Sequence, residues 1–126
     1  MSPIALDSSS LIRYLNGRGG SDTAAVRDML AAGRAVVPPL VVSEVLSLPE
    51  LPEEVAELVC GLAQLAITAG YWERTGALRA SVLGGGQRAR MADTLIAQSC
   101  IDHGVPLITA GADFRHFVPH GLRLHP

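Results

Sequence analysis

Short apolar runs alternate with longer segments of helical periodicity along the 126-residue chain. The runs that are typical of buried strands cover residues 3–6, 35–37, 65–67, 105–109 and, more weakly, 121–124. Such an alternation favours a parallel sheet covered by helices on both faces. We therefore expect one α/β domain over residues 1–126, a three-layer α/β/α sandwich whose central parallel sheet has about four or five strands.

Six longer segments have the apolar spacing and the end signals of helices. The second of them is predicted to begin with Ser21 as its cap, and the sixth to end at Gly104. Their approximate bounds are 10–15, 21–32, 39–48, 53–62, 72–82 and 90–103. In a parallel sheet of this kind the functional crevice lies outside the carboxyl ends of the strands, so polar residues at those ends are the candidates for function.

All ten basic residues are arginine, and the chain has no lysine. This excludes a Walker phosphate-binding loop and Schiff-base chemistry, because both need a lysine amine. The formal net charge is -2, with a pI near 6.0. Net charge therefore gives no general attraction for nucleic acid, and any such contact needs a local arginine patch or bound metal.

The two cysteines, Cys60 and Cys100, lie forty positions apart without a zinc-binding spacing around them. We interpret both as buried free thiols of a protein in a reducing compartment. No apolar stretch approaches the ~20 residues of a membrane helix. The first residues also lack the pattern of a signal peptide, so we expect a cytoplasmic protein without a membrane segment.

Two aspartates follow predicted strands. Asp7 comes directly after the first apolar run, and Asp113 lies four residues beyond Thr109, where the 105–109 strand ends. Each is placed to contribute a carboxylate to the crevice. Each is equally placed to cap the helix that follows it, because aspartate is a preferred N-terminal cap.

Two further carboxylates interrupt apolar helix faces. Glu44 shares a face with residues 40, 41, 45 and 48, which are all apolar, and Asp93 is the only charged residue within 91–101. A buried carboxylate without a partner costs several kcal/mol, so such a residue needs a cation, a metal or a raised pKa. The alternatives are that Glu44 lies at the edge of the apolar stripe and that Asp93 stabilises the first turn of its helix.

Four carboxylates that converge on one crevice repel one another unless divalent cations neutralise them. Carboxylate oxygens suit Mg²⁺ or Mn²⁺, and the chemistry that such sites support is phosphodiester hydrolysis. Zinc binding by His116 and His120 is disfavoured, because Pro119 interrupts the helix that would align them. Serine hydrolysis by residues 8–10 is also disfavoured, since the strained turn of such enzymes is absent.

The sequence resembles the PIN-domain family, and most of all its VapC-like toxins of type II toxin-antitoxin systems. The segments that carry the resemblance span nearly the whole chain in the family's order: Ile4-Ala5-Leu6-Asp7-Ser8-Ser9-Ser10-Leu11-Ile12, Ser43-Glu44, Ala92-Asp93-Thr94-Leu95-Ile96-Ala97, Pro106-Leu107-Ile108-Thr109 and Asp113-Phe114.

This resemblance implies a metal-dependent endoribonuclease that cuts structured RNA, forms a homodimer and is silenced by a cognate antitoxin. It implies that Asp7, Glu44 and Asp93 bind Mg²⁺ or Mn²⁺, and that Asp113 helps to position metal or water. Ser9 matches a hydroxyl residue that supports the first aspartate, and Thr109 matches the threonine at the end of the fourth strand. Two arginines near the crevice, Arg88 and Arg90, are candidates for holding the RNA backbone.

One position departs from the family pattern. Many members have an acidic residue two positions after the threonine and often another four positions after it, whereas this chain has Gly111 and then Asp113. Asp113 either replaces that acid after a small shift of the loop or only caps the next helix. The alternatives to an active toxin are therefore a catalytically impaired module that binds RNA or an antitoxin, and a housekeeping RNA-processing nuclease.

Overall fold

The computed structural model describes residues 2–126, which form a four-stranded parallel sheet flanked by helices. The strands are β1 (Ile4–Leu6), β2 (Ala35–Val37), β3 (Ala63–Gln64) and β4 (Leu107–Ile108). The helices are α1 (Ser8–Leu15), α2 (Ser21–Ala31), α3 (Pro39–Leu46), α4 (Glu53–Cys60), α5 (Tyr71–Gly84), α6 (Met91–His103) and the 3-10 helix η1 (Ala112–His120). The predicted α/β/α class with a parallel sheet is confirmed.

The spatial order of the strands is β3-β2-β1-β4. Strands β2 and β3 follow outward from β1 on one side, and β4 returns to pair on the other side of β1. In the register, Ala5 faces Val36 on one side and Leu107 on the other. The strand order therefore reverses between β1 and β4, and the carboxyl ends of these two strands form the switch point where α/β sheets bind ligands.

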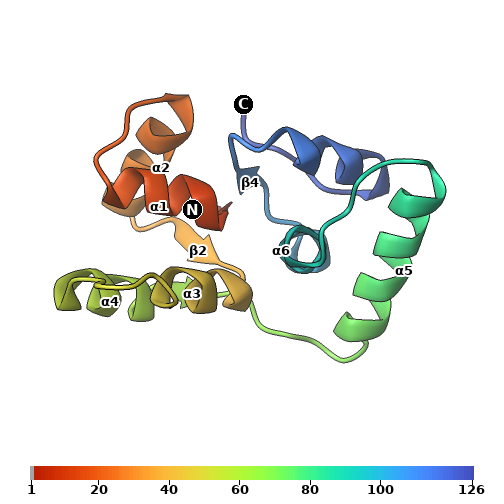
Figure 1. The fold of residues 1–126 in the computed structure, drawn as a ribbon, viewed down its shortest axis with the longest axis horizontal. Coiled ribbons are helices and arrows are strands. Elements are labelled where there is room, and N and C mark those ends of the chain that lie inside the picture. Colours follow the sequence, from red (N-terminus) through yellow and green to blue (C-terminus); the bar gives the residue numbers. More distant parts are fainter. Residues whose placement is uncertain (1) are drawn as a thin grey trace.

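The helices gather into two groups beside the sheet. Figure 1 shows α1 to α4 on one side of the molecule, and α5, α6 and the final helical segment on the other. Helix α1 packs against α2 and α3, while α5 packs against α6. The three residues of β1 are all buried, as expected of a strand covered on both faces. Within residues 2–126, every helix falls short of the length or apolarity needed to cross a membrane.

Several elements differ from the sequence prediction. The third strand is Ala63–Gln64, which ends before the predicted run 65–67, and both of its residues are exposed at the edge of the sheet. The segment 121–124 forms an isolated bridge between Leu124 and Leu107 and is not a fifth strand. Helix α2 is preceded by Gly20 as its N-terminal cap, so Ser21 is its first residue and is not the cap.

The prediction of two buried thiols is correct for Cys100 and wrong for Cys60. Cys100 is buried within α6, but Cys60 is exposed at the end of α4. Among the residues of α4 only Val59 is fully buried, so this short helix, which packs against α3, meets the rest of the protein with one narrow face. Cys60 follows Val59 directly and therefore points away from that face.

Candidate active site

The candidate site lies at the carboxyl ends of β1 and β4. Asp7 directly follows β1 and Thr109 directly follows β4. The Thr109 hydroxyl donates a hydrogen bond to Oδ2 of Asp7, so the two strand ends are joined by their side chains. This is the switch point of the sheet, and it is where the sequence predicted the crevice.

Asp7 has two roles at once. Its Oδ1 accepts a hydrogen bond of 2.8 Å from the backbone N–H of Ser10, which caps α1, and its side chain also faces the crevice. The Ser9 hydroxyl lies 3.4 Å from Oδ2, at the long end of the hydrogen-bond range. Burial raises the pKa of Asp7, and the hydrogen bonds from Thr109, Ser10 and Ser9 partly offset that rise. Capping and a place in the site were posed as alternatives, and the geometry shows both.

Glu44 reaches the same crevice from α3. Val41 and Val45 on this helix are fully buried, whereas Glu44 is half-buried, so it lies at the edge of the apolar stripe and not at its centre. Its Oε1 accepts a hydrogen bond from the hydroxyl of Ser8, which belongs to the first turn of α1. The carboxylate is thereby held toward the end of β1.

Asp93 lies in the first turn of α6 and is half-buried. Burial raises its pKa; the charge of Arg90 acts against this, and the nearby carboxylates of Asp113, Asp7 and Glu44 raise the pKa further. The four predicted carboxylates are therefore close enough to act on one another electrostatically. A cation placed among them would remove this repulsion.

Two adjoining cavities hold the four carboxylates. The first, of about 230 Å³, has three of them on its walls together with serine and apolar side chains; its lining is Asp7, Ser8, Ser9, Ile12, Glu44, Asp93, Ile96 and Phe114. The second, of about 340 Å³, is lined by Ser9, Arg90, Asp93, Gly111, Ala112, Asp113 and Phe114. Asp93 borders both cavities, so it lies between Asp7 and Glu44 on one side and Asp113 on the other.

The donor set suits a hydrated divalent cation. Carboxylate and hydroxyl oxygens are ligands that Mg²⁺ and Mn²⁺ accept. No three His, Cys, Asp or Glu side chains within residues 2–126 lie close enough together to enclose an ion by themselves. Mg²⁺ usually keeps several waters and takes only one or two protein carboxylates, so the cavities fit an ion that retains water better than one enclosed by protein.

The loop after β4 contains Gly111, at a position where the family pattern has an acidic residue. The backbone N–H of Gly111 donates a hydrogen bond of 2.9 Å to the Thr109 hydroxyl oxygen. Asp113 lies in the first turn of η1 and makes no cap hydrogen bond, since the cap residue of that helix is Gly111. Of the two alternatives for Asp113, the geometry therefore gives it a place on the cavity wall and not the role of a cap.

Both predicted RNA-binding arginines precede α6. Arg90 is the residue before the helix and lines the second cavity beside Asp93. Arg88 is exposed, and its backbone carbonyl oxygen lies 2.9 Å from Nδ1 of His116. This contact ties the α5–α6 loop to η1, so His116 has a structural role in holding that loop.

The role of Ser8 was not predicted from the sequence. Support of the site was expected from Ser9 and Thr109, whereas the hydroxyl that contacts Glu44 belongs to Ser8. The contact joins residues 36 positions apart, and helical or strand periodicity carries no information about it. The one signal was the run of three hydroxyl residues after Asp7.

The fold is shared with solved structures of low sequence identity. The chain is similar to VapBC2 from Rickettsia felis bound to a DNA fragment from their promoter, with a TM-score of 0.73 and 18% identity over 97% of this chain and 96% of that chain. It is similar to FitAB bound to an IR36 DNA fragment, with a TM-score of 0.72 and 15% identity over 97% and 93% of the two chains. FitAcB from Neisseria gonorrhoeae gives a TM-score of 0.68 and 15% identity over 98% and 96%.

A search of curated proteins gave no match. The PIN domain family matches residues 4–118, a range that includes both strand ends and all four carboxylates of the site. PIN domains are generally nucleases. The chain therefore belongs to the PIN domain family.

Proposed function

We propose that this protein is a metal-dependent endoribonuclease and the toxin of a toxin-antitoxin pair. The observation that carries the proposal is that three carboxylates from separate elements, Asp7, Glu44 and Asp93, line one cavity at the switch point of the sheet. Such a convergence is costly for the folded chain unless a cation is bound there. It has no evident structural purpose, because only Asp7 also caps a helix.

Asp7, Glu44 and Asp93 would hold a hydrated Mg²⁺ or Mn²⁺ in this proposal, in part through the waters that the ion retains. The cation would supply a nucleophilic water at neutral pH and would stabilise charge on the scissile phosphate. Asp113, on the wall of the adjoining cavity, would orient the attacking water. Ser8 and Thr109 keep the carboxylates of Glu44 and Asp7 in place, and Ser9 adds a weaker contact.

The proposed substrate is structured RNA in the cytoplasm. Arg90, at the rim of the second cavity, has a guanidinium suited to a bidentate contact with the phosphate next to the scissile bond. Arg88, two residues earlier and exposed, would extend the contact along the backbone. These arginines supply the positive charge that the chain as a whole lacks.

The proposed protein partners are a cognate antitoxin and a second copy of the chain. The structural relatives VapBC2 and FitAB support the antitoxin, since both names describe pairs of proteins and both structures include DNA. An apolar groove of about 210 Å³ also supports contact with another protein chain. It runs beside α3, α5 and α6 and includes Trp72, which is 62% exposed, and Ile67, which is 47% exposed.

Calorimetry on EDTA-stripped protein tests the metal site first. We expect Mn²⁺ to bind the natural protein and binding to weaken at least about tenfold in each of Asp7→Asn, Glu44→Gln and Asp93→Asn. Asp28→Asn is the matched control, because Asp28 is exposed on α2 and, within residues 2–126, forms an ion pair only with the adjacent Arg27. Equal binding by the three site variants and the control would overturn the proposal.

Hydrolysis of RNA is the second half of the test. The natural protein should cut a mixture of transfer and ribosomal RNA only when Mg²⁺ or Mn²⁺ is present, and Asp93→Asn should abolish the cleavage. Metal binding without any cleavage would favour a second candidate, a catalytically impaired module that binds RNA or an antitoxin. The specific observation that favours this candidate is Gly111, which stands where many family members have an acid.

A further inference from the structure

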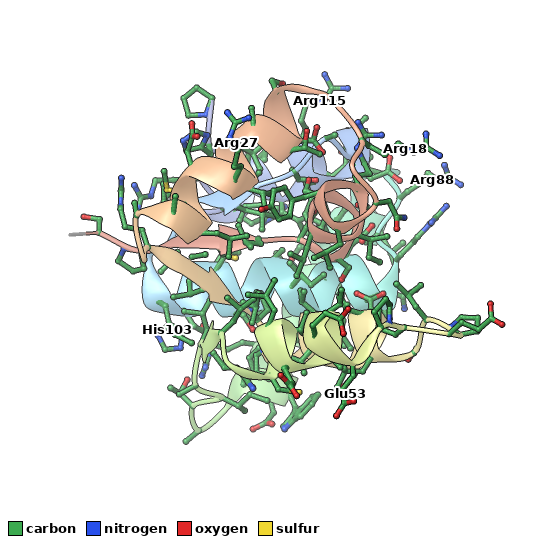
Figure 2. The ribbon with its side chains drawn as sticks, turned by 90° about the vertical axis from the view of Figure 1, so that its left-hand side faces the viewer. Arg18, Arg27, Glu53, Arg88, His103 and Arg115 are labelled. Carbon is green, nitrogen blue, oxygen red and sulfur yellow. The ribbon has the colours of Figure 1, made fainter. Side chains whose placement is uncertain are left out.

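The charges of the chain are divided between two parts of the fold. All six glutamates and no arginine fall within residues 35–73, which gives that segment a formal charge of -6. The remainder holds all ten arginines and six aspartates, a formal charge of +4. Figure 2 shows the division in space: Arg18, Arg27, Arg88 and Arg115 project from one half of the molecule, and Glu53 projects from the other. A polyanion would approach the arginine half.

Most arginines of that half are occupied by contacts within the protein. Arg74 forms a salt bridge of 2.7 Å with Asp102, and Arg13 one of 3.2 Å with Asp22. Among the contacts of residues 2–126, no hydrogen bond or ion pair engages the guanidinium of Arg18. In the same part of the chain, the guanidinium of Arg27 pairs only with the adjacent Asp28, at 3.4 Å, and both side chains are about two-thirds exposed. Such a pair is worth little in water, so both guanidiniums are available to a ligand.

Arg18 and Arg27 line the same cavity, which we call the Arg18–Arg27 cavity. It has a volume of about 270 Å³ and lies where the α1–α2 loop meets the first two turns of α2. Its other walls are an aromatic ring, a threonine, an alanine and three glycines: Tyr14, Thr23, Ala24, Gly17, Gly19 and Gly20. An aromatic wall and two cationic groups are the combination with which proteins hold single-stranded nucleic acid.

The loop that forms this cavity is held in place by Arg13. Its guanidinium donates to the carbonyl oxygen of Gly19 at 2.8 Å and to the Asp22 carboxylate at 3.2 Å. Gly20 adopts a φ of +143°, and a Cβ there would lie 2.7 Å from Oδ1 of Asp22, so this close approach requires glycine. The cavity is therefore preformed, and binding does not have to order the loop.

Helix α1 connects this cavity to the candidate active site. Asp7 caps the beginning of α1, and Tyr14 is the penultimate residue of the helix. Seven residues of helix at ~1.5 Å each separate them by roughly 10 Å. With stacked nucleotides spaced ~3.4 Å apart, this separation corresponds to about three nucleotides.

We propose that the Arg18–Arg27 cavity binds the RNA substrate about three nucleotides from the scissile bond. Arg18 and Arg27 contact backbone phosphates there, and the ring of Tyr14 stacks on a base. The inference rests on the proposed ribonuclease function and adds to it a binding site outside the carboxylate cavities. Its contacts are with phosphate and with the face of a base, so it contributes affinity and not sequence preference.

Fluorescence anisotropy with a labelled, unstructured 12-nucleotide RNA of mixed sequence tests this site. Binding is measured in Mg²⁺ between 50 and 200 mM salt, in the Asp93→Asn protein so that the RNA stays intact. Replacing Arg18 and Arg27 together by glutamine should weaken binding about tenfold at 50 mM salt. It should also reduce the slope of log Kd against log salt by about 1.4, since each phosphate contact in a single strand contributes ~0.7.

Two further variants separate this site from general electrostatics. Arg34→Gln with Arg123→Gln removes the same charge from the amino-end side of the sheet, where these arginines bind the carbonyl oxygens of Ser2 and Gly104, and should change the slope by less than about 0.4. Tyr14→Leu keeps an apolar side chain against the core and should weaken RNA binding about fivefold with an unchanged slope. The same Tyr14→Leu change should leave the binding of a 12-residue polyglutamate unaltered.

Several results would overturn the inference. The first is an unchanged slope of log Kd against log salt in the variant of Arg18 and Arg27, and the second is an equal loss of RNA affinity in the control variant of Arg34 and Arg123. The third is an equal effect of Tyr14→Leu on the binding of RNA and of polyglutamate, and the fourth is no RNA binding by the Asp93→Asn protein. The last two would indicate an acidic protein partner for this surface or no ligand. Hydrolysis of RNA by the natural protein is measured separately, so a nuclease that lacks this contact is distinguished from a protein that is not a nuclease.

Discussion

The hydroxyl of Thr109 donates a hydrogen bond to the carboxylate of Asp7, although 102 positions separate the two residues in the chain. The same hydroxyl oxygen accepts the backbone N–H of Gly111 at 2.9 Å. One side chain therefore joins the end of β1 to the loop that leads into η1. Because β1 and β4 are neighbours in the sheet, this contact is made across the switch point itself.

Replacing Thr109 by valine should lower both stability and metal affinity. Valine keeps the β-branched shape but leaves the Gly111 N–H without its partner and removes a donor from Asp7. The free energy of unfolding should fall by roughly 1.5–3 kcal/mol, the range for a lost hydrogen bond to a charged group. Mn²⁺ affinity should fall roughly tenfold, because the carboxylate is less firmly oriented. Urea unfolding and calorimetry measure the two effects.

Serine at position 109 is the control for this prediction. Thr109→Ser keeps the hydroxyl and loses only a methyl group, so metal affinity should stay within about twofold of the natural protein. If Thr109→Val binds Mn²⁺ as well as Thr109→Ser does, the hydrogen bond to Asp7 has no part in the metal site.

Replacing Asp93 by asparagine should stabilise the metal-free protein while it removes activity. The pKa of Asp93 is raised, which means that the folded state disfavours its charge. At neutral pH the charge of Asp93 destabilises the folded protein, and the neutral amide of asparagine does not have this effect. We expect Tm in EDTA to rise by roughly 2–4 °C, the shift that ~0.5–1 kcal/mol causes in a chain of this size. Differential scanning calorimetry provides the measurement.

The same difference in Tm should depend on pH with a defined sign. A carboxyl group with a raised pKa in the folded state binds its proton more tightly there than in the unfolded chain. Its protonated form therefore adds stability at low pH, and that stability is lost as the pH rises through the folded pKa. The gap between Asp93→Asn and the natural protein should be present at pH 7 and should narrow toward pH 4. A gap that widens on acidification would contradict the assigned burial of this charge.

Much of the fold follows from local patterns in the chain. The strands β1 and β2 are continuous apolar runs that are buried on both faces, and this is what made them recognisable. Helix α6 ends at Gly104, whose φ of +62° is the left-handed conformation that glycine adopts readily. Strand β3 was misplaced because Ala63 and Gln64 lie exposed at the sheet edge, so no buried run marks it.

The sequence allowed the carboxylates of the site to be predicted, but not how their side chains are arranged and held in space. The position of Asp7 after an apolar run and of Asp93 within an apolar helix drew attention to them, because each departs from a local pattern. The contact of Ser8 with Glu44 depends on how α1 packs against α3, which no periodicity reports. The free guanidinium of Arg18 is likewise visible only once the partners of the other arginines are known.

The two cysteines should react very differently with thiol reagents. Cys60 is exposed on α4, whereas burial raises the pKa of Cys100 to about 12, with a further contribution from the charge of Asp7. The thiolate is the reactive species, so Cys100 is protected both by its low ionisation and by its burial. We expect one thiol to react with Ellman's reagent at pH 8 in the native protein and two after denaturation. Cys60→Ser should abolish the native reaction, and two fast-reacting thiols would contradict the packing of α6.

An acid introduced at position 111 distinguishes an active enzyme from an impaired one. Gly111 has a φ of -74°, so any residue can adopt its backbone conformation. A Cβ there would lie 3.2 Å from the Thr109 hydroxyl oxygen and 3.5 Å from Cδ2 of Phe114, which requires a shift of a few tenths of an ångström. The new carboxylate of Gly111→Asp would enter the cavity that already holds Asp93 and Asp113.

If Asp113 already supplies the acid of this cavity, Gly111→Asp should change the rate of RNA cleavage by less than about threefold. It should also lower Tm in EDTA, because a further carboxylate joins those that already raise the pKa of Asp93. Gly111→Asn is the control, since it has the same size without the charge and separates crowding at Thr109 from repulsion. A gain in cleavage of tenfold or more in Gly111→Asp alone would instead show that Asp113 does not replace the missing acid. The natural protein would then hold RNA or its antitoxin with little turnover.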